Sequence, residues 1–185
     1  AQPTFMVIYN RYFKSPRTSI AHLQSDYSSL GGNKLSHYDE LIQANAKKMG
    51  WDWRLLAAVV YQESKFIPDG ESWAGARGLM QLMPATAKRF GANDPGDPKQ
   101  SLKAGVNYLM YLEKYWTSRA ADDQERLKFV LASYNAGLAH ILDARKLCTK
   151  YGKDESRWED VEYYLLKKSE PEFYRDPLVV AGYCK

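Results

Sequence analysis

The stretch "LAAVVYQESKF", residues 56–66, places a glutamate inside an apolar helical pattern. Leu56, Val59 and Val60 recur at the spacing of one buried helix face. Glu63 follows Val59 by four residues, so we expect it to share that face. Burial disfavours the ionised form of a carboxylate and raises its pKa, which lets the group act as an acid near neutral pH. The alternative is a structural glutamate that pairs with an arginine or lies at the rim of the core, and this helix alone does not decide between them.

Helical patterns continue on both sides of this stretch. Ser36 begins a Ser-x-x-Asp helix start, Gly50 marks a helix end, and Asp52 can cap the helix that carries Glu63. Pro84 occupies a typical first helical position. The sequence predicts helices over residues 1–14, 36–49, 84–91, 123–137, 138–150 and 157–168, and another with Leu102, Val106, Leu109 and Leu112 on one face. No alternating pattern is long enough to indicate a strand, so the expected fold class is mainly α.

The composition is typical of a globular domain. The chain has 185 residues, of which 45% are hydrophobic and 26% charged, and this length suits one domain with a sizeable core. The net charge of +4 is scattered and forms no basic stripe among aromatic residues, which argues against nucleic acid as a partner. No apolar run approaches the ~20 residues that span a bilayer. Fourteen tyrosines and five tryptophans offer flat rings on which sugars can pack, although most are expected in the core.

The cysteines and histidines indicate no metal site. Cys148 and Cys184 belong to no metal-binding spacing, and the three histidines, His22, His37 and His140, are far apart in the sequence. We therefore expect no structural zinc. A disulfide between the two cysteines is open to the chain in an oxidising compartment.

Three short segments carry residues suited to sugar chemistry. They are Glu63-Ser64, "GARGLMQLMPATA" (residues 75–87) and "ASYNAG" (residues 132–137). Met80, Gln81, Tyr134 and Asn135 supply amide, hydroxyl and polarisable groups of the kind that hold a sugar. Taken singly, each segment is also explained as ordinary turn or helix-end chemistry.

Together, in this order, the three segments resemble the lytic murein transglycosylases of the soluble-lytic-transglycosylase type, relatives of goose-type lysozyme. The family pattern is a Glu-Ser pair, then Gly-Leu-Met-Gln, then Ala-x-Tyr-Asn-Ala-Gly, and "SWAGARGLMQLMPATA" (residues 72–87) matches almost without gaps. The resemblance implies a mainly α, lysozyme-like domain without cofactor or metal, with Glu63 as the catalytic residue. The substrate-binding residues that it implies are Ser64, Ser72, Met80, Gln81, Tyr134 and Asn135.

The likeness is strongest to a membrane-bound subgroup in which the catalytic domain follows a solute-binding-type domain. It implies that residues 1–14 are a remnant of that domain, residues 15–35 a linker, and residues 36–185 the catalytic domain without its last C-terminal helix. It also implies a periplasmic protein, attached to the outer membrane through other parts of the full-length chain. Lys65 and Ile67 depart from the family, because relatives often have Gly and Asn there.

The implied chemistry uses one glutamate twice. Most glycosidases need two carboxylates, and the nearest candidates here, Asp69 and Glu71, belong to no motif. In the family the single glutamate first acts as an acid on the bond between N-acetylmuramic acid and N-acetylglucosamine. It then acts as a base on the C6 hydroxyl, which leaves a 1,6-anhydro end on the glycan strand. The alternatives are a hydrolytic muramidase or chitinase on the same fold, or a non-catalytic glycan-binding module.

Overall fold

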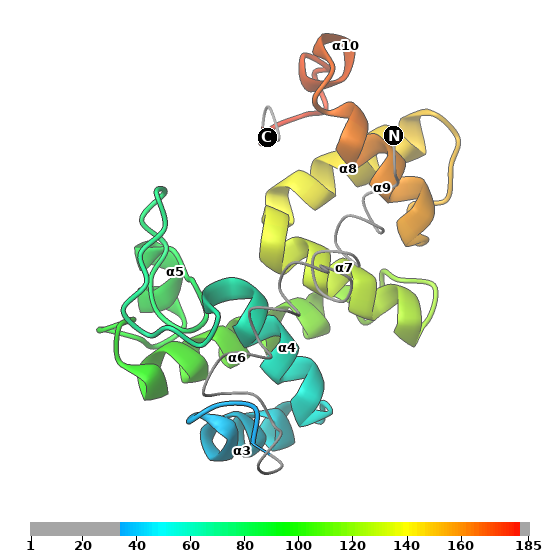
Figure 1. Cartoon of the computed structure of the whole chain (residues 1–185). Helices are drawn as coiled ribbons and strands as arrows, with labels where there is room; N and C mark the ends of the chain where they lie inside the picture. Colours follow the sequence, from blue (N-terminus) through cyan, green and yellow to red (C-terminus); the bar gives the residue numbers. More distant parts are fainter. Residues whose placement is uncertain (1–33, 182–185) are drawn as a thin grey trace, which may run out of the picture. The chain divides into compact units, whose positions relative to one another are not determined.

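The computed structural model describes residues 34–181 (Figure 1). Within that range every regular element is a helix, and β-type pairing is limited to isolated bridges of Arg77 with Glu71 and Leu82. This confirms the predicted mainly α fold. The helix predicted over residues 1–14, nearly all of the predicted linker, and Cys184 lie outside the described residues. The described chain divides into two compact units, residues 34–110 and 111–181.

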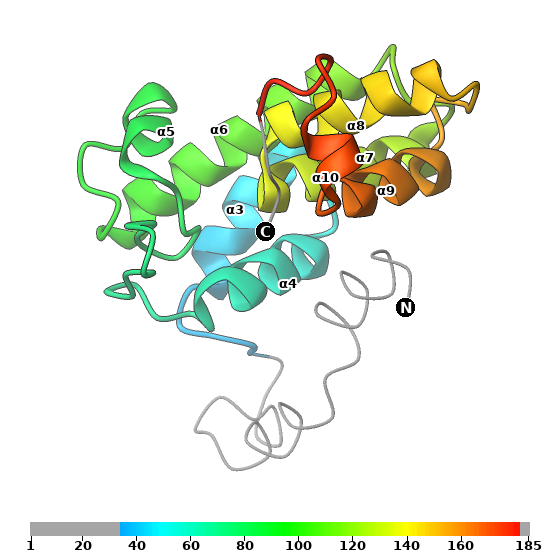
Figure 2. The same ribbon diagram turned by 90° about the horizontal axis from the view of Figure 1, so that it is seen from above.

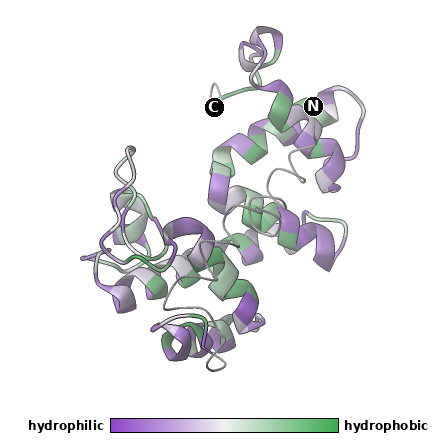
Figure 3. Cartoon of the chain, in the orientation of Figure 1, coloured by the Kyte–Doolittle hydropathy of each residue, from purple (hydrophilic) through white to green (hydrophobic). Residues whose placement is uncertain are grey.

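The first unit contains a packed pair of helices and a long loop. It contains α3 (Asp39–Met49), α4 (Trp53–Ser64), α5 (Pro84–Arg89) and most of α6 (Pro98–Trp116). α3 and α4 pack against each other (Figure 2). Polar and apolar residues alternate around the helices (Figure 3), as expected for helices with one buried face. Leu102, Val106, Leu109 and Leu112 of α6 are all buried, which confirms the predicted face.

Capping side chains, a left-handed glycine and a proline define the helix ends in this unit. α3 begins at Asp39 and not at Ser36 as predicted. The Asp39 carboxylate accepts hydrogen bonds from the Ser36 N–H and hydroxyl, both at 2.8 Å, and these bonds hold the residues before Asp39 in a turn. Gly50 ends that helix with φ 74°. Asp52 caps α4 by accepting the Arg54 N–H at 2.8 Å, as predicted. α5 begins at Pro84 as expected and ends at Arg89, two residues before Gly91.

The second unit contains the last turn of α6, α7 (Asp123–Ala136), α8 (Leu138–Lys150), α9 (Trp158–Lys167) and the short α10 (Pro171–Tyr174). α8 packs against both α7 and α9. An aromatic column forms part of its core: Trp116 stacks on Phe129 at 4.5 Å between ring centroids, and Phe129 meets the edge of Trp158 at 5.4 Å. The three helices predicted between residues 123 and 168 are confirmed.

Candidate active site

Glu63 lies one residue before the C-terminal end of α4. Its side chain is partly buried, whereas Val59 and Val60 on the same helix are almost completely buried. Ser64 is buried, and its hydroxyl donates a hydrogen bond to the carbonyl of Val60 at 3.2 Å. Glu63 therefore lies at the edge of the apolar face, between core and solvent. That its pKa is raised stays a prediction.

The backbone takes left-handed conformations directly after this pair. Lys65 has φ 55° and Phe66 has φ 63°, and Gln81 follows later in the chain with φ 45°. In residues 34–181 these are the only non-glycine residues with positive φ. Such conformations cost a residue with a Cβ atom on the order of 1–3 kcal/mol and cluster at binding and catalytic sites. All three fall within or next to the segments that the sequence singled out.

Gln81 holds the loop of residues 70–82 together. Its side-chain nitrogen donates to the carbonyls of Gly70 at 2.9 Å and Gly78 at 3.0 Å. Because both partners are carbonyl oxygens, the atom that faces them must be the amide nitrogen. The amide oxygen of Gln81 is the end that remains for a ligand.

Gly78 and Met80 attach this loop to the start of α6. A Cβ atom on Gly78 would lie 1.8 Å from the carbonyl oxygen of Pro95, and its φ is 80°, so only glycine fits there. The Met80 N–H donates to the buried Ser101 hydroxyl at 3.2 Å. The Met80 side chain is fully buried and lies against Gly105 of α6. This packing gives Met80 a role in positioning the loop, and its predicted contact with a sugar stays a prediction.

The tip of the loop is a tight turn that carries an exposed tryptophan. The Ser72 hydroxyl accepts the Ala76 N–H at 3.0 Å, and the Ser72 carbonyl accepts the Gly75 N–H at 2.9 Å. Trp73, at the tip, is 93% exposed. Trp73 was not among the predicted site residues, although its position inside the "SWAGARG" segment was a usable signal.

Asp69 and Glu71 lie at the surface. Both side chains are exposed, and Glu71 forms an ion pair with Arg77 at 3.5 Å in which each side chain is at least half exposed. Both carboxylates are therefore accessible to water.

The third segment lies in the second unit, at the end of α7. Tyr134 is partly buried and Asn135 is exposed, and the helix ends at Gly137 with φ 92°. Ser133, the residue before them, is completely buried and accepts the indole N–H of Trp116 at 3.0 Å. This bond and the aromatic column fix the last turn of α7.

A buried charged cluster beside this segment was missed by the sequence analysis. Lys168, the residue directly after α9, is fully buried, and its Nζ lies 3.1 Å from His140 Nδ1 and 3.0 Å from Asp143 Oδ2. Burial and the charge of Lys168 lower the pKa of His140. Burial alone would raise the pKa of Asp143, but hydrogen bonds from Val180, Lys168 and Ala181 outweigh it and lower that pKa. The i, i+3 spacing of His140 and Asp143 on α8 was the available signal.

The predicted site residues are thus distributed over three short segments. Glu63 and Ser64 lie at the end of α4, and Ser72, Met80 and Gln81 belong to one hydrogen-bonded loop in the same unit. Tyr134 and Asn135 belong to the other unit.

The part of the chain that the structure describes contains neither a cluster of metal-ligand side chains nor a membrane-spanning helix. Between residues 34 and 181 no three His, Cys, Asp or Glu side chains gather as metal ligands would. No helix in that range is both long and apolar enough to cross a bilayer. Cys148 is buried, and burial raises its pKa to about 11. Cys184 lies outside the described residues, so the disulfide that the sequence leaves open stays open.

Known proteins match the chain over most of its length. The family model described as "Transglycosylase SLT domain" matches residues 40–157. A protein of Desulfosudis oleivorans named membrane-bound lytic murein transglycosylase F is 37% identical over 94% of this chain and 38% of its own length. Proteins with the same name from Maricaulis maris and Pasteurella multocida are 43% and 46% identical, over 77% and 66% of this chain. These matches span only 31% and 25% of the relatives' lengths, so the chain corresponds to well under half of each relative.

Proposed function

The chain belongs to the transglycosylase SLT domain family, and on this premise we propose that it cleaves the glycan strands of peptidoglycan without consuming water. The observation that carries the proposal is the position of Glu63. It is the acidic residue of the family's Glu-Ser pair, partly shielded at the end of α4, while its neighbours Asp69 and Glu71 are exposed. The proposed active site therefore has one carboxylic acid suited to proton transfer.

In the proposed reaction Glu63 transfers a proton twice. As an acid it protonates the glycosidic oxygen between N-acetylmuramic acid and N-acetylglucosamine, and the C1–O bond breaks. The substrate's own acetamido group stabilises the cationic carbon, as in other substrate-assisted glycosidases. The Glu63 carboxylate then takes the proton of the C6 hydroxyl, whose oxygen closes on C1. The acid is restored, and the strand ends in a 1,6-anhydro ring.

The surrounding residues are proposed to position the sugar. Ser72, Tyr134, Asn135 and the free amide oxygen of Gln81 are candidates for direct hydrogen bonds to it. Ser64 and Met80 are buried, which favours a supporting role in which they hold Glu63 and the loop in place. Such positioning matters because a small displacement of reacting groups can reduce a rate ~10²-fold.

Product analysis tests this function and separates it from hydrolysis. Purified peptidoglycan digested in heavy-oxygen water should give muropeptides that end in unlabelled 1,6-anhydromuramic acid and resist borohydride reduction. Reducible, oxygen-labelled ends as the main product would make the chain a muramidase. In that case Asp69→Asn and Glu71→Gln would be the first variants to examine for a second carboxylate.

A substitution at the acid tests the role of Glu63. Glu63→Gln keeps the shape but cannot exchange the proton, so turnover should fall at least ~10²-fold. Asp69→Asn serves as the matched control, because it removes an exposed carboxylate six residues away and should leave turnover unchanged. Near-native turnover by Glu63→Gln with a normal melting transition would contradict the assignment.

We further propose a periplasmic location, because peptidoglycan is the substrate. The name of the relatives, membrane-bound lytic murein transglycosylase, supports attachment of the full-length protein to a membrane. We place that attachment outside residues 34–181. Fractionation of cells that produce the full-length protein tests both statements.

A further inference from the structure

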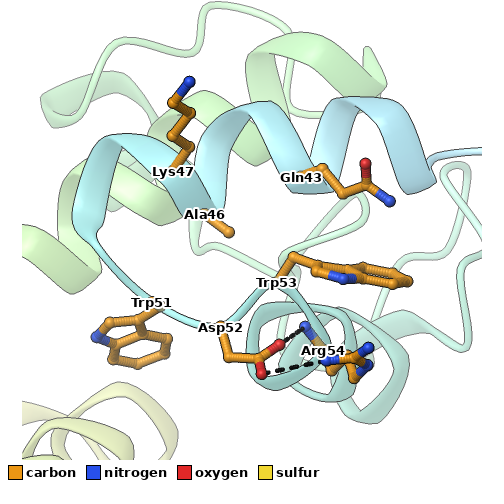
Figure 4. A pocket seen from close by; sticks show the side chains of 7 residues that line it. All are labelled: Gln43, Ala46, Lys47, Trp51, Asp52, Trp53 and Arg54. Atoms are coloured by element: carbon orange, nitrogen blue, oxygen red, sulfur yellow. Dashed lines mark hydrogen bonds and ion pairs between the residues drawn. The ribbon is translucent and has the colours of Figure 1, made fainter.

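A cavity of about 440 Å³ lies where α3 meets the start of α4 (Figure 4). Its aromatic and polar lining comes from Gln43 and Lys47 of α3 and from the consecutive residues Trp51, Asp52, Trp53 and Arg54. Trp53 precedes Glu63 by ten residues of the same helix, so the two lie about 15 Å apart along the helix axis. The cavity is therefore separate from the candidate active site but held rigidly relative to Glu63.

The composition of the lining favours a sugar. Trp51 and Trp53 are both partly buried, so packing within the protein does not use their whole surface. Figure 4 shows the two indoles on either side of Asp52, with the Trp53 ring close to Gln43. Flat rings pack on the apolar face of a sugar, and neighbouring amide and carboxylate groups can bind its hydroxyls.

The charges of the lining favour an anionic ligand. The lining includes two cationic side chains, Lys47 and Arg54, and a single carboxylate, that of Asp52. In Figure 4 the Lys47 ammonium points away from Asp52, so it reaches a ligand only when its flexible side chain turns toward the cavity. Asp52 is already engaged, because it accepts the Arg54 N–H at 2.8 Å as the cap of α4. The side-chain ion pair of Arg54 with Asp52 is 3.4 Å long, and these side chains are 72% and 58% exposed. A pair this exposed contributes little to stability, so Arg54 can turn to a ligand's carboxylate at small cost.

We propose that this cavity is an accessory binding site for a carboxylate-bearing amino sugar of the N-acetylmuramic acid type. An indole packs on the ring, Arg54 binds the carboxylate, and Lys47 joins it when its side chain turns toward the cavity. The choice of sugar rests on the proposed function, since a peptidoglycan strand repeats this unit. A second contact on the helix that carries Glu63 raises the effective concentration of the strand at the active site.

A pair of sugars that differ in the carboxylate tests the site. The unaltered chain, labelled with nitrogen-15, is titrated with N-acetylmuramic acid and with N-acetylglucosamine, which lacks the lactyl carboxylate. The indole N–H signals of Trp51 and Trp53 should shift saturably with the first sugar and more weakly with the second. The buried Trp116 and Trp158 serve as fixed references, and the exposed Trp73 reports non-specific stacking.

Matched lysine variants show whether the cavity's charge is responsible. Lys47→Gln should weaken binding of N-acetylmuramic acid about two- to fivefold and remove its preference over N-acetylglucosamine. Lys48→Gln alters the next residue, which does not line the cavity, and should change neither. Equal shifts for both sugars, shifts no larger than those of Trp73, or equal effects of the two variants would overturn the proposal.

The outcome is independent of the test of catalysis. Anhydro products without specific shifts at Trp51 and Trp53 would remove the accessory site and leave the proposed function standing. Specific shifts at Trp51 and Trp53 without anhydro products would support the accessory site and contradict the proposed function.

Discussion

Lys65 and Phe66 fix the point at which the chain leaves α4, directly after the proposed acid. The Lys65 N–H closes the helix on the Tyr61 carbonyl at 2.8 Å, and the Ile67 N–H returns to the Ser64 carbonyl at 2.9 Å. The φ of Lys65 is left-handed, a conformation that glycine adopts without a steric penalty and that strains a residue with a Cβ atom. The chain therefore holds backbone strain two residues after Glu63.

Two substitutions of Lys65 should reveal that strain. Lys65→Gly and Lys65→Ala both remove the ammonium group, which lies 4.1 Å from the centre of the Tyr61 ring. They differ only in whether a Cβ atom must adopt a left-handed conformation, so the glycine variant should be more stable than the alanine variant by about 1 kcal/mol. Urea denaturation of both variants measures this difference. Equal midpoints would show that the backbone at residue 65 is unstrained.

At the scale of the elements, α6 supports the loop of residues 70–82 through a tight contact between Gly105 of α6 and Met80 of the loop. A Cβ atom on Gly105 would lie 2.5 to 2.8 Å from three side-chain atoms of Met80, including its Cβ. Since Met80 also donates its N–H to Ser101 of the same helix, the loop is attached to α6 by both backbone and side chain. The position of Gln81, one residue later, depends on this attachment.

Gly105→Ala tests the attachment. Alanine favours a helix over glycine by almost 1 kcal/mol, yet the clash with Met80 should outweigh this gain and reduce stability by about 1–3 kcal/mol. Peptidoglycan cleavage should fall as well, because the loop must move. Gly96→Ala is the control: its Cβ would approach only Asp94 Oδ1, at 3.2 Å, and its melting temperature should stay close to native. A melting temperature of Gly105→Ala at or above the native value would contradict the contact.

For the whole molecule, the sequence predicted the helices better than the site. Helix ends could be located because Gly50, Asp52, Pro84 and Gly137 are residues with strong local preferences. The left-handed turn at Lys65 had no such signal. The burial of Met80 against Gly105, and of Lys168 between His140 and Asp143, depends on which helices pack together, and local sequence patterns do not contain that information.

The stability of the molecule should depend on pH through Glu162. This side chain of α9 is buried, its Oε1 has no hydrogen-bond partner among the described residues, and burial and the charge of Glu159 raise its pKa from 4.5 to about 7. The folded state therefore keeps a proton that the unfolded state loses above pH 4.5. The free energy of unfolding should fall between about pH 4.5 and pH 7, by up to about 3 kcal/mol, and remain low above that.

The variant Glu162→Gln isolates this effect. It should be more stable than the native chain at pH 8 and should differ little from it at pH 4.5, as measured by urea denaturation across that range. Glu159→Gln, which removes the neighbouring charge, lowers the folded pKa of Glu162, so the fall in stability should be smaller and should end at a lower pH. Parallel stability curves for the native chain and Glu162→Gln would mean that Glu162 does not carry the proton.

The cluster around Lys168 has a consequence for how the chain opens and exchanges hydrogen with solvent. Asp143 accepts the N–H groups of Val180 and Ala181 at 3.0 and 2.7 Å, so a buried carboxylate holds the backbone of a segment without regular secondary structure. The Val180 side chain is 80% exposed. Its amide proton can nevertheless exchange with deuterium only when the hydrogen bond to Asp143 breaks. That proton should therefore exchange at a rate closer to those of α8 and α9 than to those of the surface turns, and Asp143→Asn should accelerate it.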